Sequence, residues 1–335
     1  MTMMIQKAIL HILDFNTNIC ILSQQDLDFS SDVVYEYVDK RIERLLKDAG
    51  QHTGVFYATS SFQHVLQKLQ MEEITFDDAA AAIAKKTYDI LSHCDETEST
   101  DLLVVDFNDD DDVRTLAVLM LENKTAYTHQ VLDEEGHVYN KLIKHYAILP
   151  GTGQKLEAYA LIRFDDFSIR FVDKKRKCNG EDMYILPDRL LQCTSCISGR
   201  DAVKMVNKIA AQVAEDHGGS SVEALSKAKS YLADHAETSD SLSPKELGAV
   251  VFSDNKEMQN QFEQEIQEAQ LPDQVPVQQD FARRTGKTHK IKTDTGIEIT
   301  FPSEYIDNSD YIQFINNPDG TLSIELKNIA KIVNK

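Results

Sequence analysis

The stretch DLLVVDF (101–107) is followed, after a short acidic break, by VRTLAVLML (113–121), and both indicate strongly apolar strands. AYTHQVL (126–132) and HVYNKLIKHYAIL (137–149) continue the pattern with no helix between them. Parallel neighbours need a long crossover connection, which this run of strands lacks. The run therefore predicts a mainly antiparallel sheet.

The segments on either side of this run alternate between the periods of strands and helices. Further strands are expected at 3–13, 18–23, 53–58, 155–164 and 167–173, and helices at 32–49, 61–69 and 75–94. From residue 198 the helical period dominates, because serines that can cap a helix precede several amphipathic runs. These runs predict helices at 198–218, 221–236, 243–252 and 255–269.

The last part of the chain returns to strands. Two prolines in LPDQVPVQ (271–278) favour a linker. The segments 290–301 and 311–326 predict hairpins, the second around Asn317-Pro318-Asp319-Gly320, whose residue types suit a tight turn.

We therefore expect an α+β protein. Its parts are an N-terminal α/β domain (1–197) with a mainly antiparallel sheet, a helical segment (198–270), a linker (271–280) and a small C-terminal β-hairpin unit (281–335) with a basic lead-in.

Composition places the chain among ordinary soluble proteins. Of its 335 residues, 42% are hydrophobic and 27% charged, and no window approaches the ~18 apolar residues of a membrane span. The start of the sequence lacks the pattern of a signal peptide. Five scattered cysteines do not form the framework of a small disulfide-rich protein, and they favour a reducing cytoplasm.

Motifs for catalysis are weak. Gly286-Lys287-Thr288 resembles part of a phosphate-binding loop, but that loop needs a glycine where Phe281 stands. Cys193-x-x-Cys196 lacks a second ligand pair at zinc spacing, so core or half-buried thiols are the favoured interpretation. The acidic run 109–112 could hold a divalent cation, although a solvated turn fits four consecutive acids better. We expect no enzymatic activity, no cofactor and no metal.

Two basic clusters stand out against a formal net charge of −20. Residues 1–280 hold 27 Lys and Arg against 48 Asp and Glu, whereas residues 281–335 hold 8 against 7. Within the latter segment, FARRTGKTHKIK (281–292) carries five positive charges and no acid. Such cations suit salt-sensitive, sequence-independent contacts with phosphates, and Phe281 and His289 could add stacking. The alternative is a solvated turn, or a patch that docks on the acidic remainder of the protein. The candidate DNA-binding residues are Arg283, Arg284, Lys287, Lys290 and Lys292, with Lys174, Lys175, Arg176 and Lys177 as a second cluster.

Framework residues along nearly the whole chain carry a family resemblance. They are Ile5, 7–14, 101–105, Leu149-Pro150, 155–158, 191–193, 292–299, Pro302, 317–324 and 327–329. In these positions the chain resembles the 37-kDa bacterial nucleoid-associated protein family. The resemblance implies a cytoplasmic protein of the nucleoid with DNA binding expected, and it brings no catalytic or ligand residue with it.

Two hypotheses for function follow. The first is a nucleoid-associated protein that binds DNA without sequence preference through the local basic patch. The second is an acidic interaction protein that binds a DNA-processing enzyme, such as a topoisomerase, and reaches DNA indirectly. Neither involves a membrane, and exposed hydrophobic strands at the chain ends make a homo-oligomer plausible.

Overall fold

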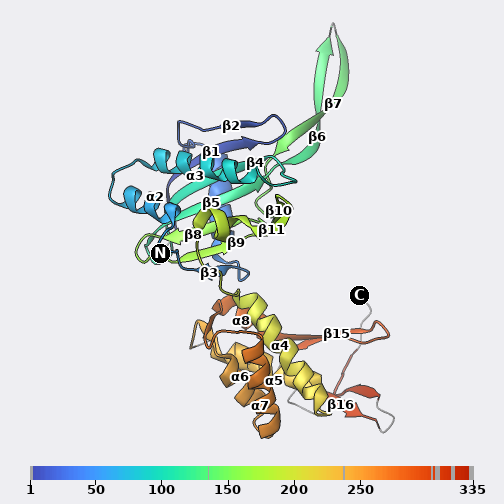
Figure 1. Ribbon diagram of the computed structural model, residues 1–335. Coiled ribbons are helices and arrows are strands. Elements are labelled where there is room, and N and C mark those ends of the chain that lie inside the picture. Colours follow the sequence, from blue (N-terminus) through green and yellow to red (C-terminus); the bar gives the residue numbers. More distant parts are fainter. Residues whose placement is uncertain are drawn as a thin grey trace. The chain divides into compact units, whose positions relative to one another are not determined.

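The computed structural model describes residues 3–134, 136–236, 238–302, 305, 310–317 and 321–331 (Figure 1). Contacts within the chain divide it into two units, Met1–Cys196 and Ile197–Lys335, and each is described by itself. Both strands and helices are abundant and the large sheet is antiparallel, so the predicted α+β class is confirmed. The finer division into four segments stays a prediction.

The N-terminal unit is built on a seven-stranded sheet. Its order is β2-β1-β4-β5-β8-β9-β3, and every neighbouring pair is antiparallel. The strands are β1 (Met4–Asp14), β2 (Ile19–Ile21), β3 (His52–Gly54), β4 (Thr100–Asn108), β5 (Arg114–Glu122), β8 (Tyr159–Arg163) and β9 (Ile169–Val172).

Helices cover both faces of this sheet. Leu103 and Val105 of β4 pack in one cluster with residues of α1 (Asp32–Leu46), whereas Leu102 and Val104 pack in another. The second cluster also holds residues of α2 (Ser61–Gln70), α3 (Phe76–Leu91) and the π-helix η1 (Leu186–Leu191). Because neither face meets water, the central strands are apolar at successive positions and do not alternate.

The next two strands of the apolar run leave the sheet. β6 (Lys124–Glu134) and β7 (His137–Ile148) pair only with each other, and this hairpin projects from the N-terminal unit in Figure 1. Nearly all of its residues are exposed. The expectation that these segments continue the sheet was wrong, because β5 pairs with β8 instead.

A smaller hairpin, β10 (Lys175–Cys178) and β11 (Glu181–Tyr184), follows β9 and was not predicted. Cys178 forms a disulfide with Cys94, which lies just beyond the end of α3. The scattered spacing of the cysteines did not indicate this pair, because only the fold brings together residues 84 positions apart.

The C-terminal unit begins with four helices around an apolar core. They are α4 (Gly199–Asp216), α5 (Ser221–His235), α6 (Pro244–Val251) and α7 (Lys256–Glu268), close to the predicted ranges. The hydroxyl oxygens of Ser198 and Ser243 accept hydrogen bonds from backbone N–H groups in the first turns of α4 and α6. Gly218 supplies the positive φ that ends α4.

The proline-containing segment packs against these helices. β13 (Val275–Pro276) pairs with β12 (Ser241–Leu242), and Val275 and Val277 are buried in the helical core. It continues into α8 (Gln279–Lys287), a helix that the basic lead-in did not predict.

Two hairpins close the described chain. β14 (Thr288–Lys292) pairs with β15 (Glu298–Pro302), and β16 (Ile312–Asn316) pairs with β17 (Leu322–Leu326), as the alternating patterns predicted. The predicted turn at 317–320 lies largely outside the described residues, which include only Asn317 of it. Of the helices described, none has the length and apolar character needed to cross a membrane.

Candidate nucleic-acid interface

Small residues fix the orientation of α8. Ala282 and Gly286, one turn apart, are buried on the side of α8 that packs against α5. A Cβ added to Gly286 would lie 2.4 Å from the Ala233 Cβ and 2.8 Å from the Lys229 carbonyl oxygen. Only glycine allows the two helices to approach this closely. Gly286 therefore serves helix packing, and the Gly-Lys-Thr sequence is not part of a phosphate-binding loop.

The basic side chains of α8 lie away from this contact. Arg283, Arg284 and Lys287 are exposed. The Arg284 Nε donates to the carbonyl oxygen of Asp280 at 3.0 Å, which holds this side chain along its own helix. Within the described residues, Arg283 and Lys287 make no ion pair. They lie four positions apart, so both fall on neighbouring turns of one exposed helix side.

The strand after α8 adds two cations that share one acid. Lys290 and Lys292 alternate along β14, and their Nζ atoms lie 2.7 and 3.6 Å from Glu298 carboxylate oxygens on β15. The hydrogen bond from Lys290 holds the pKa of Glu298 below its usual value. Residues 281–292 therefore carry five cations and no acid, while Asp280 stands in the first turn of α8 and the acid that pairs with the lysines, Glu298, lies on β15. We call Arg283, Arg284, Lys287, Lys290 and Lys292 the basic face.

The aromatic groups near the basic face are not available for stacking on bases. His289 is buried and stacks on Phe301 at 5.7 Å between ring centroids, while Phe281 packs against the helical core. Burial, with a smaller contribution from the positive charge of Lys229, lowers the pKa of His289 to about 4. His289 is therefore neutral near pH 7. The expectation of stacking from these two residues was wrong, because both rings serve internal packing.

The second cluster is divided between internal pairs and exposed lysines. The Lys174 Nζ lies 2.7 Å from Glu122 and 2.8 Å from Glu157, and the Arg176 side chain, 9% exposed, pairs at 2.7 Å with Asp173. Burial raises the pKa of the Asp173 carboxyl, and the charge of Arg176 opposes this effect. Lys174 and Arg176 therefore compensate acids of the same unit, of which Asp173 is buried and Glu122 half-buried.

The other two members of that cluster, Lys175 and Lys177, are exposed on β10. The cluster lies in the N-terminal unit and the basic face in the C-terminal unit. Each is therefore assessed as a separate surface.

The other sequence motifs have structural partners. Burial, helped by the negative charge of Asp188, raises the pKa of Cys193 to about 12, so this thiol stays protonated.

The acidic run 109–112 forms a turn. The Asp109 carboxylate accepts hydrogen bonds from the backbone N–H groups of Asp111 and Val113 and pairs with Arg163 at 3.3 Å. These bonds close the acidic turn on itself. Within the described residues, no three metal-ligating side chains are grouped.

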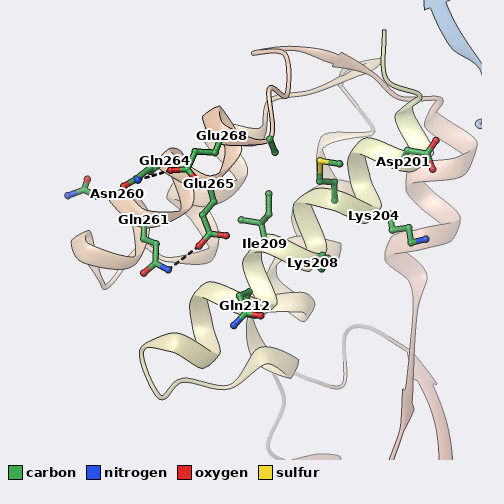
Figure 2. A pocket seen from close by; sticks show the side chains of 12 residues that line it. Asp201, Lys204, Lys208, Ile209, Gln212, Asn260, Gln261, Gln264, Glu265 and Glu268 are labelled. Atoms are coloured by element: carbon green, nitrogen blue, oxygen red, sulfur yellow. Dashed lines mark hydrogen bonds between the residues drawn. The ribbon is translucent and has the colours of Figure 1, made fainter. Parts of the chain in front are cut away.

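A groove of about 1140 Å³ runs between α4 and α7 (Figure 2). Met205 and Ile209 supply apolar lining, and Lys204 and Lys208 lie along α4 beside them. On the α7 side, glutamine amides donate to carboxylates, as from Gln261 to Glu265 at 3.0 Å. The lining holds acids and amides bonded to each other, without a nucleophile next to a base. The groove therefore gives no support to a catalytic site.

The fold and these surfaces define a two-unit α+β protein with a locally basic C-terminal segment on a strongly acidic chain. The family model described as nucleoid-associated protein YejK matches residues 9–333, and the chain belongs to this family. The resemblance drawn from the framework residues is thereby confirmed. A comparison with curated proteins gave no match.

Proposed function

We propose that this protein binds DNA directly and without sequence preference, through phosphate contacts made by the basic face. The observation that carries the proposal is the arrangement of α8. Its small residues pack on α5, and Arg283 and Lys287 are exposed and unpaired among the described residues. Exposed Arg and Lys side chains bind phosphates at short range even when the rest of a protein repels them.

The proposal assigns a binding role in the nucleoid, in the cytoplasm, rather than catalysis. Lys175 and Lys177 are secondary candidates for phosphate contacts, because they are exposed while their neighbours Lys174 and Arg176 compensate acids. Membership of the nucleoid-associated family supports the proposal.

Two double variants test it with matched charge. Arg283→Ala with Lys287→Ala removes two exposed cations four positions apart on α8, and Lys204→Ala with Lys208→Ala does the same on α4. Affinity for a duplex of mixed sequence is measured by fluorescence anisotropy across a salt series. We expect the first variant to reduce the slope of log K against log salt by about 1.8, since each lost phosphate contact contributes about 0.9.

The control on α4 should keep both affinity and slope. Equal losses of DNA affinity in the two variants would mean that only the net charge of the protein matters, and the basic face would not be the DNA-binding site. A wild-type protein that binds no DNA at low salt would refute direct binding altogether.

The second candidate is an interaction protein that reaches DNA through a DNA-processing enzyme. The observation in its favour is the acidity of residues 1–280, with 27 basic against 48 acidic side chains. Such a surface attracts basic proteins and repels DNA. This hypothesis predicts that the purified chain is retained on DNA only after a basic DNA-processing partner is added. Retention of the chain by itself would contradict it.

A further inference from the structure

The β6–β7 hairpin carries an apolar face that the described chain leaves uncovered. In its register Tyr127 lies opposite Lys144, His129 opposite Leu142, Val131 opposite Asn140 and Asp133 opposite Val138. Directly opposed residues of an antiparallel pair place their side chains on the same face. Tyr146, two positions after Lys144, belongs to this face too.

Five large side chains dominate that face, which we call the ribbon face. They are between 59% and 71% exposed: Tyr127, Val131, Val138, Leu142 and Tyr146. The Lys144 Nζ lies 6.0 Å from the Tyr127 ring centroid and 4.8 Å from that of Tyr146, which confirms that the three share one side. Contiguous exposed apolar residues of this kind mark an interaction surface. A two-stranded hairpin alone in water is also only marginally stable.

The charge of the hairpin argues against DNA as the occupant of the ribbon face. Among its described residues, Lys124, Lys141 and Lys144 are nearly balanced by Asp133 and Glu134. The two acids lie at the tip, the part that would first enter a groove of the duplex. A ribbon that reads DNA needs cations there, because phosphates line both grooves. An apolar face of almost no net charge fits a protein surface better.

We propose that the ribbon face binds the ribbon face of a second copy of this chain, in a two-fold dimer with the two hairpins packed face to face and antiparallel. The positions of the charges support this partner. Asp133 lies at the tip of the ribbon face, and Lys144 lies toward its base. An antiparallel two-fold arrangement sets the Lys144 end of each copy over the Asp133 end of the other, so opposite charges meet twice. The middle of the ribbon face, where Val131 and Leu142 alternate with Asn140 and His129, then packs on itself.

The size of the ribbon face is sufficient for such a dimer. The two tyrosines expose roughly 150 Å² each and the three aliphatic side chains roughly 100 Å² each, so two copies together remove on the order of 1,000 Å² from water. This estimate reaches the approximate lower limit for a specific interface. Packing two ribbons about 10 Å apart also covers the hairpin that would otherwise stand alone in water.

The test compares a charge on each side of the same ribbon. Leu142→Asp places a carboxylate on the ribbon face, and Thr128→Asp places one on the opposite face, where Thr128 lies across from Ile143. Both positions are exposed in the described chain, so neither change disturbs the core. Sedimentation equilibrium of the DNA-free protein should show a dimer for the wild type and for Thr128→Asp. Leu142→Asp should raise the dissociation constant of the dimer about 100-fold or more, since the central Leu142 side chain is lost from both copies.

A charge exchange tests the antiparallel register. Asp133→Lys and Lys144→Asp should each weaken the dimer about tenfold, because each places like charges together twice. The combined variant should return to within about threefold of the wild type. On one ribbon these residues are separated by several residue pairs, so recovery requires contact between copies.

A wild type that stays monomeric at its highest soluble concentration would overturn the proposal, as would equal effects of Leu142→Asp and Thr128→Asp. If Leu142→Asp left the mass unchanged but abolished DNA binding, the ribbon face would belong to DNA instead. Because the mass is measured without DNA, these outcomes are independent of the basic face.

Discussion

Replacing Gly286 by alanine tests how closely α8 packs against α5. The added Cβ would lie 2.4 Å from the Ala233 Cβ and 2.8 Å from the Lys229 carbonyl oxygen. Carbon atoms in contact normally lie about 3.5–4.0 Å apart, so α8 has to move away by about 1 Å. Neither neighbouring atom moves when a side chain rotates, so the backbones themselves have to separate.

Two effects of opposite sign set the magnitude. Alanine is about 1 kcal/mol more favourable than glycine inside a helix. Overpacking a close contact costs about 1–3 kcal/mol. We therefore expect Gly286→Ala to lower the free energy of unfolding of the C-terminal unit by up to about 2 kcal/mol. Gly286→Val should lower it by about 3 kcal/mol, because valine adds two methyl groups and has a poorer helix propensity than alanine.

Urea unfolding followed by circular dichroism measures these changes, with hydrogen exchange of α5 amides to assign them to the C-terminal unit. Thr285→Ala is the control, because it improves helix propensity on the same helix at a half-buried position outside the close contact. If Gly286→Ala were as stable as Thr285→Ala, α8 would not pack closely on α5. The orientation assigned to the basic face would then lose its support.

Three further predictions concern charge. Glu298→Gln releases its two lysine partners, so DNA affinity at low salt should rise about tenfold and the salt slope should steepen by about 0.9 for each phosphate gained. His289 has a folded pKa of about 4, below its unfolded value of about 6.5, so stability is full above pH 6.5 and falls as the pH decreases toward 4. Between pH 6.5 and 4, the free energy of unfolding of His289→Phe should therefore fall by about 3 kcal/mol less than that of the wild type, as measured by urea unfolding. Arg176→Leu should lower the free energy of unfolding by about 3 kcal/mol at pH 7, because it leaves the buried Asp173 charge without its partner. The control Lys177→Ala should change thermal stability little.

Each of these has a contrary outcome. Unchanged binding in Glu298→Gln would mean that the paired lysines do not face DNA. An acid profile that His289→Phe leaves as steep as the wild type would place the titrating group elsewhere. Equal stability of Arg176→Leu and Lys177→Ala would show that the pair with Asp173 is not needed in the fold.

The central sheet could be predicted because its signal is local. The apolar character of β4 and β5 follows from burial on both faces, and the acidic break between them leaves little room for anything but a hairpin. The same reasoning failed for β6 and β7. Their sequences also favour strands, but a pattern of strand residues does not say which neighbour a strand pairs with. Pairing of β5 with β8, far along the chain, displaced them.

The basic segment shows a second limit. The charges of this segment could be read from the sequence, but the helix α8 could not be predicted. Glycine and threonine are poor helix formers, and QDFARRTGK contains both. Tertiary packing overrides that propensity, since Gly286 allows the contact with α5 that stabilises the helix. Likewise, the run 174–177 reads as four equal cations, and only the fold shows that two of them compensate acids at Glu122 and Asp173.

The strand order of the N-terminal unit also has a consequence for how the chain is made. β1 leaves the ribosome before β4 and pairs with it along almost its whole length, and only the last three residues of β1 pair with β2. Until β4 (Thr100–Asn108) has been synthesised, β1 therefore has most of one edge and both faces uncovered. The helices that lie between β1 and β4 in the chain can already form, because their contacts are local. The nascent chain should thus be most prone to aggregation during this interval, and holding of that first strand by a chaperone should matter more for yield than the stability of the finished fold.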